Sequence, residues 1–117
     1  MKDEYLGAAG NGFGDWLWQR ASAVILILTL PFPFILLLCL TGGCLDQAGL
    51  LSLLVHPFAK TAHSLLVLAM LVHAYLGLKV IMEDYVPVLA LRLPLLLATL
   101  VLALGTGIWT LAMIWSW

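Results

Sequence analysis

Most of the side chains that could do chemistry in this sequence lie within one stretch, HAYLGLKVIMEDYVPVLALRL. The stretch contains His73, Lys79, Glu83, Asp84, Tyr85 and Arg92. A histidine can bind a metal ion, and a carboxylate beside a tyrosine can hold a substrate and relay protons to it. Ionisable groups inside an apolar segment indicate a functional site, because their burial is costly.

His73 is the candidate metal ligand, because neutral imidazole is a common axial ligand of haem iron. On a helix, Ala69 and Gly77 lie one turn to either side of His73 and leave room for a flat porphyrin to approach the backbone. His63 is about 15 Å away along such a helix and cannot share an iron atom with His73. A second axial histidine must therefore come from a partner chain. The alternative is a packing histidine that is hydrogen-bonded to a neighbouring helix.

Asp84 lies on the same face of the helix as His73, about 16 Å nearer the membrane surface. Tyr85 follows it and can donate a hydrogen bond from its hydroxyl group. Asp84 could instead cap the next helix or be exposed to solvent, and Tyr85 could be an interfacial tyrosine. Arg20, at the start of the first apolar run, could simply extend to phosphate headgroups. Cys39 and Cys44 form a lone C-x4-C pattern, which is weak evidence for a metal site or a disulfide and is interpreted as two small apolar residues at a membrane edge.

The elements that position these residues are three apolar runs, predicted at residues 20–40, 58–82 and 93–116. Each is long enough for a helix to cross about 30 Å of hydrocarbon. The composition agrees, since 64% of the 117 residues are hydrophobic, only 9% are charged and the mean hydropathy is +1.13. We therefore predict an all-α membrane protein, with residues 1–117 forming a single membrane-anchor domain. The sequence PFPF interrupts the first run, and we expect a kinked but continuous span there.

The basic residues predict the orientation of the three spans. One side of the membrane is expected to hold Lys2, Arg20, Lys79 and Arg92, and the other only Lys60. The bias places the N-terminus and the 83–92 loop in the cytoplasm, and the 41–57 loop and the C-terminus outside. Tryptophans at both ends of the spans fit the two interfaces. With a net charge of −1 and no basic run, nucleic acid is not an expected partner.

Two motifs resemble the small hydrophobic membrane anchor of succinate dehydrogenase. The first comprises His73, Ala74, Gly77, Asp84, Tyr85 and Arg92. The second is DWLWQRASA, similar to the W-x-x-Q-R-x-[ST]-A entry to the first helix of the family. The resemblance covers nearly the whole chain. It departs at Gly14, where several members carry a histidine, and the role of that histidine does not transfer to this chain.

The resemblance implies a subunit of succinate:quinone oxidoreductase that is not catalytic alone. A second cytochrome b anchor subunit, an iron–sulfur subunit and a flavoprotein subunit are the implied partners. His73 matches the axial ligand of a haem b shared with the second anchor, Asp84 and Tyr85 match the quinone site, and Arg20 matches a residue near the haem propionates. The expected location is the bacterial cytoplasmic membrane rather than the mitochondrial inner membrane. A fumarate reductase anchor and a non-redox membrane scaffold remain as alternatives, and ubiquinone and menaquinone are not distinguished.

Overall fold

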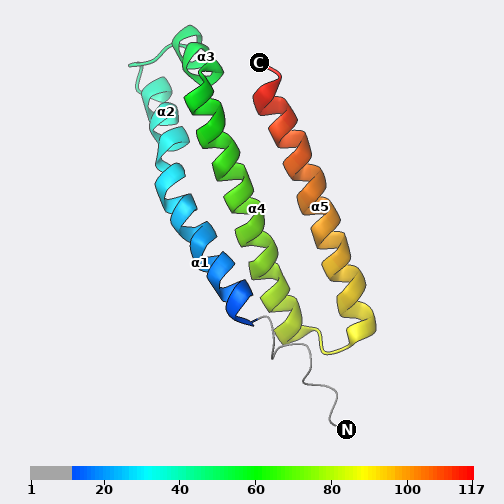
Figure 1. Ribbon diagram of the computed structural model, residues 1–117. Coiled ribbons are helices and arrows are strands. Elements are labelled where there is room, and N and C mark those ends of the chain that lie inside the picture. The colour runs from blue at the N-terminus through cyan, green and yellow to red at the C-terminus, as the bar shows by residue number, and fades with distance from the viewer. Residues whose placement is uncertain (1–11) are drawn as a thin grey trace.

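The structure is a computed structural model that describes residues 12–117. Every regular element in this part of the chain is an α-helix, so the predicted all-α class is confirmed. The helices are α1 (Gly12–Thr29), α2 (Pro31–Thr41), α3 (Gln47–Val55), α4 (Pro57–Tyr85) and α5 (Leu89–Trp115). They form three long columns that run up, down and up again (Figure 1). Lys2, which contributes to the predicted charge bias, lies outside the described residues.

The first column is made of α1 and α2, which follow one another along the same direction (Figure 1). Pro31 has no N–H to donate and so interrupts the helical hydrogen-bond ladder. Leu30 nevertheless keeps helical backbone angles, and its N–H donates to the Leu26 carbonyl at 2.8 Å. Gly12–Thr41 is therefore one apolar span of 30 residues, as predicted for the PFPF sequence.

The turn between the first two columns contains a helix that the sequence did not predict. In place of a simple loop over residues 41–57, α3 occupies Gln47–Val55. Asp46 caps its N-terminus, because the carboxylate accepts a hydrogen bond from the Gly49 N–H at 2.8 Å. At the other end His56 caps α4, where its Nδ1 accepts a hydrogen bond from the Phe58 N–H at 3.2 Å.

The second and third spans are longer than the predicted runs. Helix α4 continues to Tyr85 rather than ending at residue 82, and α5 begins at Leu89 rather than at residue 93. Only a short connection, residues 86–88, separates the two helices. The N-cap position of α5 is Val88, so the alternative role of Asp84 as the cap of the next helix is wrong.

Helix α4 is the central column and packs against both α1 and α5. The buried apolar side chains of the described residues all belong to it: Ala59, Val67, Ala69 and Leu76. Most large apolar side chains of the other helices are exposed, as expected for surfaces that contact lipid or other subunits. The three columns are each long and apolar enough to cross a membrane, in agreement with the predicted three spans.

Candidate functional site

His73 lies half-buried in the contact between α4 and α1, and α1 supplies all of its hydrogen-bonding neighbours among the described residues. Its Nδ1 is 3.2 Å from the Ser22 hydroxyl oxygen and 3.3 Å from the Gln19 carbonyl oxygen. Its Nε2 is 3.4 Å from the Gln19 side-chain nitrogen. Both ring nitrogens of this membrane-embedded histidine are therefore in contact with polar groups.

These contacts favour one position of the imidazole proton, with the Gln19 amide oriented as the structure has it. The Ser22 hydroxyl donates to the Gln19 carbonyl at 3.0 Å, which leaves the lone pairs of the hydroxyl oxygen for an N–H donor. The carbonyl oxygen is also an acceptor, so this set of contacts assigns the proton to Nδ1. The Nε2 lone pair then faces the amide group of Gln19. A metal ligand needs this arrangement, in which one ring nitrogen donates to an oxygen and the other keeps its lone pair.

The sequence builds this contact from small residues at helical spacing. Gln19 and Ser22 are three residues apart and so lie on the same face of α1. Ser22 is only 3% exposed, so a small hydroxyl side chain fits where the helices meet. On α4, Gly77 lies beside the glutamine, and a Cβ added there would be in ordinary van der Waals contact, at 3.7 Å, with the Gln19 side-chain nitrogen. The close fit of α1 on α4 thus positions the histidine.

The residues fit an imidazole-bound haem iron, with one rearrangement. The Gln19 amide occupies the position in front of the Nε2 lone pair, and its Oε1 is buried without a hydrogen-bond partner among the described residues. A glutamine held there at the cost of an unpaired oxygen can turn away when another group takes the lone pair. Of the two small residues expected beside a porphyrin, Ala69 is 5% exposed and packs within the chain itself.

A groove of about 320 Å³ runs along α1 and α4 beside this contact. Its lining residues are Gly12, Asp15, Trp16, Gln19, Arg20, Ala23, Leu76, Val80 and Glu83. The guanidinium carbon of Arg20 lies 5.9 Å from the centre of the Trp16 ring, within range of a cation–π interaction. Arg20 therefore follows Gln19 along α1 and offers a positive charge in the groove next to the histidine contact.

An ion pair that the sequence analysis did not predict lies where the start of α1 meets the last turns of α4. The Lys79 ammonium nitrogen lies 2.5 Å from the carboxylate of Asp15. These residues are 64 positions apart in sequence, so no local spacing could have revealed the pair. Their opposite charges on neighbouring spans were the only available signal. The pair links the start of α1 to the last turns of α4.

Asp84 and Tyr85 form the end of α4, where the predicted quinone site would lie. Both are exposed, and 81% of Tyr85 is accessible. Within residues 12–117, no hydrogen bond joins either side chain to another residue. In Figure 1 this end of α4 lies beside the start of α1, at the opposite end of the bundle from α3. The two side chains are thus available for contacts outside this chain.

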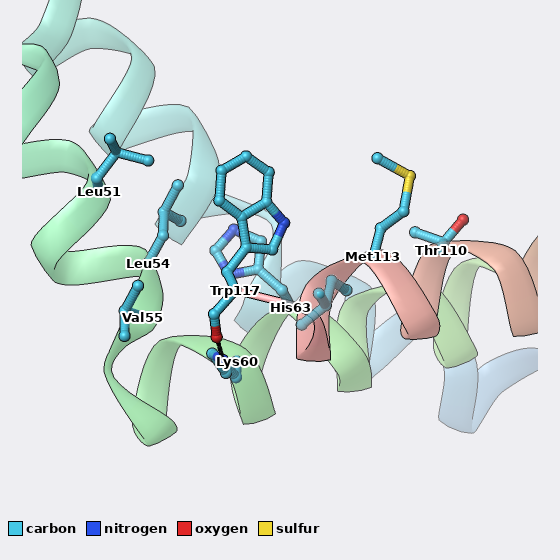
Figure 2. Close-up of a pocket in the computed structure, with 9 residues that line it drawn as sticks. Leu51, Leu54, Val55, Lys60, His63, Thr110, Met113 and Trp117 are labelled. Carbon is cyan, nitrogen blue, oxygen red and sulfur yellow. Dashed lines mark hydrogen bonds between the residues drawn. The ribbon is translucent and has the colours of Figure 1, made fainter.

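A second cavity, of about 350 Å³, lies at the other end of the bundle (Figure 2). It is lined by Leu51, Leu54, Val55, Lys60, His63, Thr110, Met113, Ile114 and Trp117. Lys60 is 8% exposed, and its ammonium group donates to the Trp117 backbone oxygen at 2.5 Å. His63 lies against Phe32, with ring centres 5.5 Å apart, and its Nδ1 is 2.8 Å from the Ala59 carbonyl. The two histidines of α4 therefore belong to separate environments.

The fold and the polar contacts together define a class, namely a three-span helical membrane protein with a half-buried histidine between its first two spans. In residues 12–117 no three histidine, cysteine or carboxylate side chains gather as a metal site, so His73 is a single candidate ligand. Residues 2–114 match the family described as succinate dehydrogenase/fumarate reductase transmembrane subunit. The chain belongs to this family. Comparison with individually curated proteins gives no match.

Proposed function

We propose that the chain anchors a succinate:quinone oxidoreductase and provides His73 as one axial ligand of haem b. The observation that carries this proposal is the arrangement of the imidazole, with Nδ1 facing two oxygen acceptors and Nε2 directed at a displaceable amide. The alternative is a packing histidine, which also makes hydrogen bonds to a neighbouring helix. The family match favours the redox complex over a non-redox scaffold.

Within this proposal each residue of the α1–α4 contact has a defined task. His73 presents the Nε2 lone pair, and Ser22 and the Gln19 carbonyl hold the ring by accepting from Nδ1–H. Arg20 offers a positive charge to the carboxylates of the porphyrin edge from the neighbouring groove. Haem b, when bound, accepts and releases single electrons. The second axial ligand is expected from a second cytochrome b anchor subunit.

We place the quinone at the end of α4. Reduction of a quinone to a quinol takes two electrons and two protons, so the site needs a hydrogen-bond donor and a path for protons. Tyr85 can donate to a quinone carbonyl from its hydroxyl group, and Asp84 beside it can orient the tyrosine or pass protons from water. Their exposure on this chain supports the proposal, because a shared site must remain open until the partner subunits close it.

The same end of the bundle is the proposed docking side for the iron–sulfur and flavoprotein subunits. From the predicted bias of basic residues we expect this end at the cytoplasmic surface of a bacterial membrane. Trp16 and Trp18 are exposed here, and Trp115 and Trp117 are exposed at the opposite end, as expected for residues at the two interfaces. Succinate is then oxidised at the flavin, outside this chain, and the electrons reach the quinone through iron–sulfur clusters.

Substitution of His73 by alanine tests the haem assignment in the assembled complex. We expect His73→Ala to leave the subunits together but to remove or disturb the low-spin haem spectrum, because the iron loses an axial ligand. His63→Ala is the matched control, since it removes a half-buried histidine from the same helix away from α1. A wild-type haem spectrum in His73→Ala would show that the ligand assignment is wrong and that His73 only packs.

A fumarate reductase anchor is the second candidate, because the family description names both enzymes. The two share the same chemistry and differ in the direction of electron flow. Redox titration of the purified complex distinguishes them. A haem and quinone at high potential favour succinate oxidation, whereas low potentials favour fumarate reduction.

A further inference from the structure

The two cysteines of the chain meet at the turn that ends the first span. Helix α2 ends in a Schellman motif, in which Gly43 adopts a left-handed conformation with φ of +74°. The Cys44 N–H donates to the Cys39 carbonyl at 3.0 Å, and the Gly43 N–H donates to the Leu40 carbonyl at 3.4 Å. This motif characteristically brings the side chains at the Cys39 and Cys44 positions into contact.

The Cys44 thiol lies close to the backbone of Cys39. The Cys44 sulfur is 3.1 Å from the Cys39 carbonyl oxygen, so its side chain points back over the helix end toward Cys39. Cys44 is exposed and Cys39 is half-exposed, so an oxidant can reach the pair. These are the only two cysteines among the 117 residues, so an intrachain disulfide has one possible pairing.

We propose that Cys39 and Cys44 form a reversible disulfide that locks the turn between α2 and α3. The proposal rests on the proposed orientation, which places this turn outside the cytoplasm, where disulfides persist.

The oxidant is a second disulfide, either a thiol–disulfide oxidoreductase or a small disulfide compound. Cys44 as thiolate attacks it and forms a mixed disulfide, releasing one thiol. Cys39 as thiolate then attacks the Cys44 sulfur and releases the second thiol. In total, two thiols lose two protons and two electrons, one S–S bond forms, and the oxidant is reduced to two thiols.

The turn is a place where such a bond has structural consequences. Asp46 and α3 follow Cys44 directly, and α3 supplies Leu51, Leu54 and Val55 to the outer cavity (Figure 2). A covalent link between the end of α2 and this turn fixes the point from which α3 starts. The disulfide therefore restrains the helix that covers one side of the cavity, without involving the histidine contact.

Oxidised glutathione is the probe for the purified complex, and maleimide labelling followed by mass spectrometry is the readout. We expect the reduced chain to take two maleimide groups, and the oxidised chain to take none and to be lighter by two hydrogen atoms. Cys44→Ser should instead retain a glutathione adduct on Cys39. Two maleimide groups on the oxidised wild-type chain, or a disulfide to a second copy on a non-reducing gel, would overturn the proposal.

Two further variants test the geometry. In Cys44→Ser with Leu45→Cys the thiol moves by one residue to a side chain that packs against Gly49, so closure should be lost. Gly43→Ala forces a side chain into the left-handed conformation, and we expect the equilibrium constant for disulfide formation to fall about tenfold. Closure that is unchanged in both variants would contradict the role of the Schellman motif.

The state of the pair in whole cells separates the sulfur chemistry from the orientation. Cells are treated with maleimide before lysis, and a chain that carries no label supports a disulfide outside the cytoplasm. A pair that closes in the purified complex but is fully labelled in cells contradicts the proposed orientation, while the sulfur chemistry stands. The haem assignment is unaffected by either result, because it is tested at His73.

Discussion

Ser22→Ala provides a sharp test of how the chain positions His73. The serine hydroxyl is buried, lies 3.2 Å from Nδ1 of the histidine, and donates to the Gln19 carbonyl at 3.0 Å. Alanine removes one of the two acceptors that face Nδ1–H and leaves the Gln19 carbonyl, at 3.3 Å, as the other. In the proposed haem site, the imidazole should therefore stay bound to iron but lose part of its orientation.

The expected magnitude follows from the one hydrogen bond that is lost. A typical net contribution is about 0.5–1.5 kcal/mol, and the remaining carbonyl offsets part of it. Removal of an outer partner of a ligating histidine usually lowers metal affinity by about 10–100-fold. Because one acceptor remains, we expect the lower end, a roughly tenfold loss of haem affinity. We also expect a higher midpoint potential, because the imidazole becomes a weaker electron donor to ferric iron, and an altered low-spin resonance, since the ring can rotate about the iron bond.

The assay is the haem content of the purified complex, together with its redox titration and electron paramagnetic resonance spectrum. Ser52→Ala is the matched control, because Ser52 makes the same type of bond to a carbonyl three residues earlier, at 2.7 Å, but lies on α3. Ser22→Thr retains the hydroxyl and should restore the wild-type resonance. If Ser22→Ala had the wild-type haem content, potential and resonance, the serine would not orient the ligand.

Three further predictions follow from the two ends of the bundle. Tyr85→Phe should lower the rate of quinone reduction by succinate about 5–150-fold, because the lost hydrogen-bond donor contributes about 1–3 kcal/mol. Succinate oxidation with a soluble acceptor should be retained. A wild-type rate of quinone reduction would show that Tyr85 is only an interfacial anchor. Asp15→Asn and Lys79→Met should each destabilise the complex by less than about 1 kcal/mol, because both side chains are partly exposed. In thermal unfolding, the double variant should lose less stability than the sum of the two single variants. With both native cysteines replaced by serine, Gln47→Cys should be labelled from outside the cell and Val88→Cys should be protected, and the reverse pattern would invert the proposed orientation.

The sequence was sufficient to predict the class of the fold, because a long apolar run in a membrane forms an α-helix. Each run must satisfy its own backbone groups, so length and apolarity predict a helix without reference to any contact. The interruption of the helix at Pro31 was equally local, because proline removes a donor from its own turn. The short helix α3 was missed, since a turn over residues 41–57 that is rich in glycine and leucine carries no period that identifies nine helical residues.

The contacts between helices could not be predicted in the same way. In a membrane every face of a helix can be apolar, so the hydrophobic pattern does not tell which face meets which neighbour. The depth at which Asp15 meets Lys79, and the match of Gln19 and Ser22 with His73, depend on the register of α1 against α4. A residue pattern along one helix contains no information about this register.

The polar groups nevertheless indicate which side of the bundle contacts a partner subunit. The groove between α1 and α4 contains Asp15, Gln19, Arg20 and Glu83, and the histidine contact lies beside it. The groove that α5 shares with α4 is lined almost entirely by apolar and aromatic side chains. A partner that brings a second axial histidine needs access to the Nε2 side of His73, and the Gln19 amide already occupies that side. We therefore expect the second anchor to approach along the α1–α4 groove and to displace this amide, while the outer face of α5 remains in contact with lipid.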